Sequence, residues 1–366
     1  MRRDFLKLCS LVGLGVATPM NRALLAATSS SQEPDPYPGP YYVVFNASGG
    51  WDTSYLMDPK GVHGINNLYQ EGDILTHGRH RFAPTSQHLK GGMSNEEFFK
   101  IYGEDLLVFQ GLDYSVNNHS PCSRYMATGK LDSPLSFLTF GNYSTTGNLV
   151  PMARVPYLHS LKLLANADGV HGNAASPYHD DFVIDRIDAA LRRHADARQA
   201  KAQLPRTERA QSMLFAAQLN SKALRRVSPY LSDEVPKEPL FQQAEIALAA
   251  FKAGVAVSAN LNLSGFDSHA NNDRDQLKLL PELLAGIDHL MKHAEKLGIR
   301  EKIVVVMQSE MGRTPGYNKN EGKDHWSIGS AMFMGNGIRG NRVIGATDEQ
   351  QDLIPIDPGT LALKPE

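Results

Sequence analysis

Cysteine is scarce in this sequence of 366 residues, in which Cys9 and Cys122 are the only two. A disulfide framework is therefore excluded, and the 42% of hydrophobic residues must supply the core by themselves. An excess of either charge is also missing, because 37 Lys and Arg residues face 39 Asp and Glu residues. The net charge of −2 excludes a nucleic-acid binder that relies on bulk basicity. Outside the N-terminus there is no run of about 20 apolar residues, so we expect no integral membrane domain.

Residues 1–27 are typical of an export signal rather than of a folded element. Arg2 and Arg3 stand before Asp-Phe-Leu-Lys, an arrangement that closely resembles the twin-arginine signal. The apolar stretch that follows, residues 8–17, is too short to span a bilayer, and Ala27 offers a cleavage point. We therefore expect an exported, periplasmic protein that uses the twin-arginine translocation machinery. That route carries folded proteins, often with a metal in place, so metal ligands are worth seeking.

The order of apolar runs predicts an α/β fold with a mostly parallel central sheet. Short runs rich in β-branched and aromatic residues are typical of buried strands, and they occupy residues 41–46, 105–110, 255–263, 302–307 and 331–334. Between them, apolar residues recur at helical intervals over residues 241–252 and from Leu277 to Ala294. Ser94 and Glu97 have the spacing of a capping box that begins another helix. Strands that alternate with helices indicate a doubly wound sheet.

Composition divides the rest of the chain. Residues 28–40 are rich in Ser and Pro without apolar periodicity, and we interpret them as an extended linker. The α/β domain then covers residues 41–366. Within it, residues 181–235 are predicted to form a charged helical insertion, whose arginines alternate with acidic residues as on a solvated helix face.

Polar side chains follow four of the predicted strands directly. Ligands of open α/β sheets bind at the carboxyl ends of strands, and the candidates there are Asp52, Asp267, His269, Glu310 and His325. Carboxylates together with imidazoles suit zinc or manganese. Five such ligands exceed one closed structural site and would suffice for two divalent metal ions a few ångströms apart.

Four motifs at these positions resemble one bacterial family. They are Gly49-Gly50-Trp51-Asp52, Phe266-Asp267-Ser268-His269, Ser309-Glu310-Met311-Gly312-Arg313-Thr314 and Asp324-His325-Trp326. Together they look like the family known as domain of unknown function 1501, in the alkaline phosphatase-like superfamily with sulfatases and phosphomutases. The resemblance implies a three-layer α/β/α core and a two-metal site for phosphate or sulfate esters of small molecules or glycans. It assigns Asp52 and Glu310 to one metal, and Asp267, His269 and His325 to the other.

The stretch from Ser120 to Arg124 is similar to the sulfatase stretch that carries the nucleophile. On that resemblance Ser120 is the nucleophile and Arg124 helps to hold the anion. Cys122 stands where the sulfatase stretch has proline, which disfavours conversion of Ser120 to formylglycine. A plain serine or a water held by the metal is favoured instead. Ser123 is a rival nucleophile, and a helix-capping role for Ser120 is also open.

Two further polar residues have open roles. Arg313 follows Glu310 by three residues and could clamp a tetrahedral oxyanion bidentately. It could equally pair with Asp52 or Asp324. His119 could donate a proton to a leaving oxygen, although a lone histidine more often serves a structural hydrogen bond.

His289 and His293 stand four residues apart on a predicted helix, which is the spacing of a metal-binding pair. They lie off the apolar face that contains Leu284, Ile287 and Met291. We therefore expect these two histidines on an exposed helix face.

Taken together, the metal-ligand candidates and the family resemblance imply an exported metal-dependent hydrolase or transferase for phosphate or sulfate esters. The alternative is a non-catalytic periplasmic binding or structural protein that keeps the fold with a degenerate metal site. No helix or strand is predicted beyond Leu361, and a truncated C-terminus is one interpretation of that ending.

Overall fold

A computed structural model describes residues 39–85, 91–128, 225–232, 236–254 and 258–364, together with residues 37, 193 and 256. The predicted export signal, nearly all of the predicted linker and most of the predicted insertion at 181–235 lie outside these residues. Within the described part, we find no helix with the length and apolar character needed to cross a membrane. The chain divides into two compact units, and the sheet described below lies in the unit of residues 38–162 and 227–366.

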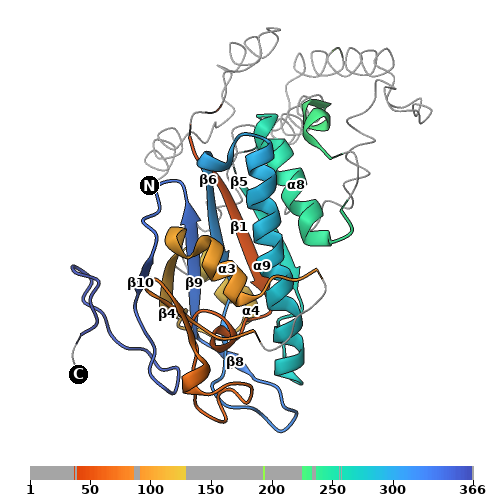
Figure 1. Ribbon diagram of the computed structural model, residues 1–366. Coiled ribbons are helices and arrows are strands. Elements are labelled where there is room, and N and C mark those ends of the chain that lie inside the picture. The colour runs from red at the N-terminus through yellow and green to blue at the C-terminus, as the bar shows by residue number, and fades with distance from the viewer. Residues whose placement is uncertain are drawn as a thin grey trace, which may run out of the picture. The chain divides into compact units, whose positions relative to one another are not determined.

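The centre of this unit is a six-stranded sheet with the order β10-β4-β9-β6-β1-β5 (Figure 1). Its strands are β1 (Tyr41–Ser48), β4 (Leu107–Asp113), β5 (Ser258–Ser264), β6 (Ile303–Gln308), β9 (Ile328–Gly335) and β10 (Arg342–Ile344). β1 runs parallel to both β5 and β6, and β10 runs parallel to β4. β9 runs antiparallel to β4 and β6. Five strands therefore share one direction, which confirms the predicted α/β fold with a mostly parallel sheet.

Three helices pack beside one another against the sheet: α3 (Asn95–Tyr102), α8 (Pro239–Lys252) and α9 (Asn272–Lys296). α9 lies along β1, with α3 and α8 at its sides (Figure 1). The capping box predicted from Ser94 and Glu97 is present at the start of α3. α9 ends before Gly298, whose φ of +68° closes the helix. The first five residues of β6 are all buried, as is typical of a central parallel strand covered on both faces.

The remaining strands are short. They form two antiparallel pairs, β2 (Leu75–His77) with β3 (His80–Phe82), and β7 (Gly312–Arg313) with β8 (His325–Trp326). Two or three residues are too few to show a period, so the sequence pattern predicts neither pair. The second pair matters for function, because it sets Arg313 directly opposite His325.

The carboxyl ends of β1, β5 and β6 meet at one edge of the sheet, since Ser48 pairs with Ser264 and Asn46 with Gln308. The loops after these strands approach very closely. Gly49 has a φ of +124°, and a Cβ atom there would lie 2.3 Å from the backbone nitrogen of Asp267. Only glycine has both the conformational freedom and the small size that this contact requires.

Replacing Gly49 with alanine should lower the free energy of unfolding by about 3 kcal/mol, because backbone strain and overpacking each cost about 1–3 kcal/mol. Urea denaturation measures the change. Gly64→Ala is the matched control, since Gly64 also has a positive φ (+93°) but nothing within 4 Å of an added Cβ. Equal losses in the two variants would mean that the approach of Gly49 to Asp267 does not constrain the fold.

Candidate metal centre

The structure gathers charged and imidazole side chains at this edge of the sheet. Asp267 follows β5, Glu310 follows β6 and His325 begins β8. His119 joins them as the first residue of α4 (His119–Thr128), the helix after β4. His269 reaches the same group from the loop after β5. Three predicted ligands of one metal, Asp267, His269 and His325, are therefore close together.

Asp267 lies at the centre of the group. Its Oδ1 is 3.1 Å from Nε2 of His269 and 3.2 Å from Nε2 of His325. Its Oδ2 is 3.5 Å from Nε2 of His119. Candidate ligand atoms of His119, Asp267 and His325 all lie within 4.8 Å of one another. Sequence reasoning treated His119 as a lone histidine, whereas the structure makes it part of the cluster.

The second nitrogen of each imidazole is held by an oxygen acceptor. The partners of the three Nδ1 atoms are Oε1 of Glu310 for His119 (2.9 Å), Oδ1 of Asp324 for His269 (2.7 Å) and the carbonyl oxygen of Asn117 for His325 (2.9 Å). An acceptor at Nδ1 favours the tautomer with its proton there, which leaves Nε2 with a lone pair. Metal-binding histidines are oriented in this way.

With the protons on Nδ1, the three Nε2 atoms and the Asp267 carboxylate are all hydrogen-bond acceptors that lie close together. Nε2 of His269 and Nε2 of His325 are 3.0 Å apart, and both face the Asp267 carboxylate. Neutral imidazoles of this tautomer would repel one another there, because each presents a lone pair. A divalent cation would satisfy all of these groups together, and three nitrogens with one carboxylate oxygen are a donor set that zinc accepts. The residues present therefore fit a metal centre.

Glu310 is 7% exposed and links the cluster to β1. Its Oε1 accepts a hydrogen bond from the backbone N–H of Gly49 (2.9 Å) in addition to its contact with His119. A small apolar cluster of Tyr114, Cys122 and Met311 lies beside it and packs α4 against the residues after β6. The position of His119 is thus determined by buried packing and by a buried carboxylate.

Arg313 is buried, and all of its nitrogens have partners. Nε donates to the carbonyl of Gly50 (2.9 Å) and Nη1 to the carbonyl of Lys323 (3.0 Å). Nη2 donates to Oδ1 of Asp267 (2.7 Å) and to the carbonyl of Gly49. The guanidinium therefore orients Asp267 and joins three loops.

The partner of Arg313 is Asp267, and neither of the two carboxylates that the sequence offered, Asp52 and Asp324, bonds to the guanidinium. Burial raises the pKa of Asp267, but the hydrogen bond and charge of Arg313, together with His325 and His269, outweigh it, so that the pKa lies below its usual value. Asp267 is thereby kept ionised, as a ligand must be. Use of Arg313 as an oxyanion clamp stays a prediction.

Asp52 lies in a different environment. Its side chain is fully buried, and its Oδ2 is 2.7 Å from Nζ of Lys323 and accepts a hydrogen bond from Asn272 (2.9 Å). Its Oδ1 accepts from the backbone N–H and the hydroxyl of Ser54. Both oxygens thus have protein partners, and an ammonium group stands where the sequence predicts a metal. A metal-binding role for Asp52 stays a prediction.

The predicted nucleophile lies next to the cluster along the chain. Ser120 is exposed and is the second residue of α4, so it stands in the first turn of a helix after β4. The hydroxyl of Ser123, the rival, donates to the carbonyl of His119 (2.7 Å). The side chain of Arg124 lies outside the part of the chain that the structure describes. The roles of Ser120 and Arg124 stay predictions.

Comparison with known structures finds matches of low similarity, among them the following three. "Crystal structure of Ps i-CgsB" has a TM-score of 0.35 and 11% identity, and the match covers 85% of this chain and 70% of that one. The same protein in complex with k-i-k-neocarrahexaose has a TM-score of 0.36, 10% identity and coverages of 84% and 68%. "BT1596, a 2-O GAG sulfatase" has a TM-score of 0.26, 11% identity and coverages of 84% and 66%. No curated protein sequence matches.

Residues 172–357, just over half of the chain, match the family described as "Protein of unknown function (DUF1501)". The matched segment contains Asp267, His269, Glu310 and His325, whereas His119 precedes it. The chain therefore belongs to the DUF1501 family.

Proposed function

We propose that the protein is a metal-dependent hydrolase or transferase that acts on phosphate or sulfate esters of small molecules or glycans. The observation that supports this most is the convergence of three imidazole Nε2 atoms on the Asp267 carboxylate while each Nδ1 faces an acceptor. The sequence resemblance to the alkaline phosphatase-like superfamily supports the ester chemistry. Arg2 and Arg3 support export to the periplasm as part of the same proposal.

The proposed centre holds one divalent ion, with zinc favoured over manganese because nitrogen ligands outnumber oxygen ligands. His119, Asp267 and His325 are its ligands, and His269 is the fourth. When bound, the ion supplies Lewis acidity that withdraws charge from an ester oxygen.

The protein's own groups position the reaction. Arg313 orients Asp267, and Glu310 orients His119, so both ligands keep their direction before substrate arrives. The hydroxyl of Ser120 stands in the first turn of α4, where the helix dipole favours a developing negative charge. We propose that this hydroxyl attacks phosphorus or sulfur and that its proton leaves with the ester's alcohol. Water, or an acceptor alcohol in a transferase, then takes the phosphoryl or sulfuryl group from Ser120 and restores the hydroxyl.

A non-catalytic binding protein is the second candidate function. The ion pair of Asp52 with Lys323 favours it, because that contact occupies a carboxylate on which the predicted two-metal mechanism depends. A protein with a single centre could hold a metal and a ligand without turnover.

The test uses the full chain, stripped with a chelator and reloaded with Zn²⁺ or Mn²⁺, on para-nitrophenyl phosphate and para-nitrophenyl sulfate. We expect metal-dependent hydrolysis of at least one ester, and a loss of metal affinity of at least about tenfold in His119→Ala. His63→Ala is the control, since His63 is exposed and outside the cluster. Metal binding without hydrolysis of either ester would favour the non-catalytic function, and unchanged affinity in His119→Ala would reject the ligand set.

A further inference from the structure

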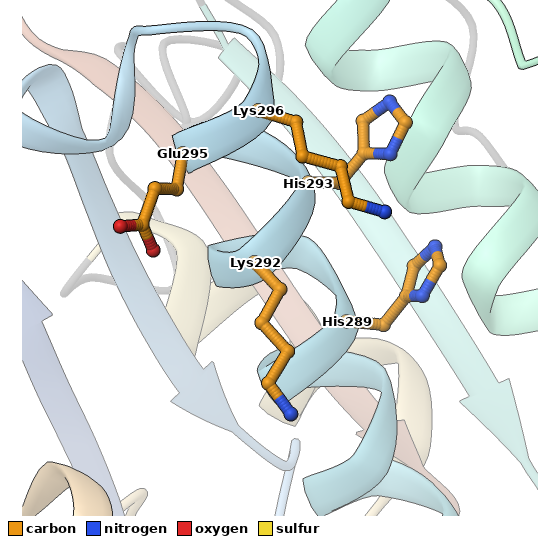
Figure 2. A pocket seen from close by; sticks show the side chains of 5 residues that line it. All are labelled: His289, Lys292, His293, Glu295 and Lys296. Carbon is orange, nitrogen blue, oxygen red and sulfur yellow. The ribbon is translucent and has the colours of Figure 1, made fainter.

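A second group of potential metal ligands lies between α8 and α9. Glu245 is on α8, while His289 and His293 are on α9, and Figure 2 shows both imidazoles on the same side of their helix. The expectation of an exposed face is wrong, because His293 is only 7% exposed and Glu245 only 3%. The reason is that α8 packs along this side of α9.

The three side chains converge. Oε1 of Glu245 is 3.0 Å from Nε2 of His289 and 3.8 Å from Nδ1 of His293. One candidate ligand atom from each residue lies within 4.8 Å of the others. Two histidines four residues apart project from one side of a helix, which is how zinc-binding helices present a pair of ligands.

Hydrogen bonding at this group is incomplete. Oε2 of Glu245 and Nε2 of His293 are buried without a hydrogen-bond partner among the residues that the structure describes, although the Ser232 hydroxyl lies near enough to the Glu245 carboxyl to stabilise its charge. Buried polar atoms in native proteins are rarely left without a partner. Two such atoms on facing side chains point to a bound species that the protein atoms alone do not provide.

The surroundings suit a small cation. The ring of His289 stacks on Phe241 with centroids 4.2 Å apart, which holds its orientation. Lys292 is paired with Asp288 (2.8 Å), and Lys296 is exposed, so its long side chain can turn away from a cation.

The group is accessible from outside. His289 and His293 line a cavity of about 420 Å³ together with Lys292, Glu295 and Lys296 (Figure 2). An ion can therefore reach the two histidines without unfolding of the helices. The pair also lies far from Asp267, since residues 272 and 289 on α9 are roughly 25 Å apart along the helix.

We propose that Glu245, His289 and His293 form a separate binding site for a divalent transition-metal ion, with zinc as the best match. Two imidazole nitrogens and one carboxylate oxygen are a ligand set that zinc uses in proteins. The ion would join α8 to α9 and neutralise the buried carboxylate. This site does not depend on the proposed function.

The test is zinc titration by calorimetry of the full-length Asp267→Asn variant, in which the other centre is disabled. We expect about one equivalent of zinc to bind and to raise the melting temperature. Adding Glu245→Gln should weaken this binding by at least about tenfold. Gln keeps the size of Glu245 and an acceptor for His289, and far-UV circular dichroism checks the fold.

Lys292→Ala in the same background is the matched control, since it changes the same face of α9 without removing a ligand, and it should bind like its parent. His293→Gln replaces Glu245→Gln if the latter does not fold. Equal zinc affinity with and without the Glu245 or His293 substitution would overturn the proposal. Hydrolysis by the otherwise unchanged protein reports on the Asp267 centre alone, so failure of one proposal is distinguishable from failure of the other.

Discussion

Replacing Asp267 with asparagine should remove the metal from the proposed centre and lower kcat/KM for ester hydrolysis by at least about a thousandfold. The carboxylate of Asp267 contacts the imidazoles of His119, His269 and His325, so it is the one proposed ligand that lies next to all the others. A bound metal contributes several kcal/mol to transition-state stabilisation, and about 4 kcal/mol corresponds to a thousandfold in rate. Metal analysis of the purified variant, together with kinetics, measures both effects.

Asp113→Asn provides the control for this experiment. Asp113 also stands at the end of a strand, β4, but it is exposed, and its Oδ1 accepts a hydrogen bond from the backbone N–H of Ser115. The Asp113→Asn variant should keep full metal content and activity. The Asp267 variant should still fold, because Arg313 retains its bonds to backbone carbonyls. A folded Asp267→Asn protein with the metal content of the wild type would reject Asp267 as the central ligand.

The elements that could be predicted from the sequence are those with a long hydrophobic pattern. β1 and β6 are continuous apolar runs, and α9 has a helical period over several turns, so their existence followed from pattern alone. The antiparallel direction of β9 could not be predicted from the sequence. It depends on the path of the loop between Gln308 and Ile328, which contains the short β7–β8 pair and has no period to interpret.

Some residues of the candidate site could also be predicted from the sequence, and one could not. The convergence of strand ends in a parallel sheet suggested all five candidates, and the family resemblance grouped Asp267, His269 and His325 at one metal. His119 was missed because its role comes from the packing of α4 and from the contact with Glu310, which lies far away in sequence. A usable signal was present, since His119 begins the helix directly after a strand.

Asp52 has a buried partner that the sequence pattern did not indicate. Its position after β1 suggested a metal ligand, but the group opposite it is Lys323, which directly precedes the Asp324-His325 motif. A buried lysine has no local pattern, since its burial depends on contacts from residues far apart in the chain. Here Nζ also donates to the carbonyl of Ile65 (2.6 Å), and its charge lies 5.1 Å from the ring centroid of Tyr317.

Lys323→Met should therefore lower the free energy of unfolding by about 3–5 kcal/mol, which is the typical cost of leaving one member of a buried ion pair alone. Both side chains have no exposed surface, so solvent cannot screen the remaining carboxylate. Urea denaturation of the metal-free protein measures the loss. Lys319→Met, a change at an exposed position in the same loop, should alter stability by no more than about 0.5 kcal/mol.

Adding Asp52→Asn to Lys323→Met should restore part of the lost stability, because the buried negative charge disappears while Ser54 keeps its acceptor. The same variants decide how many metals the edge of the sheet holds. If the ammonium of Lys323 is the cation that neutralises Asp52, then Lys323→Met alone should bind no more zinc than the wild type. An additional equivalent of zinc that restores the stability of Lys323→Met would instead mean that Asp52 is a latent metal ligand, and the two-metal prediction would return with Lys323 as its competitor.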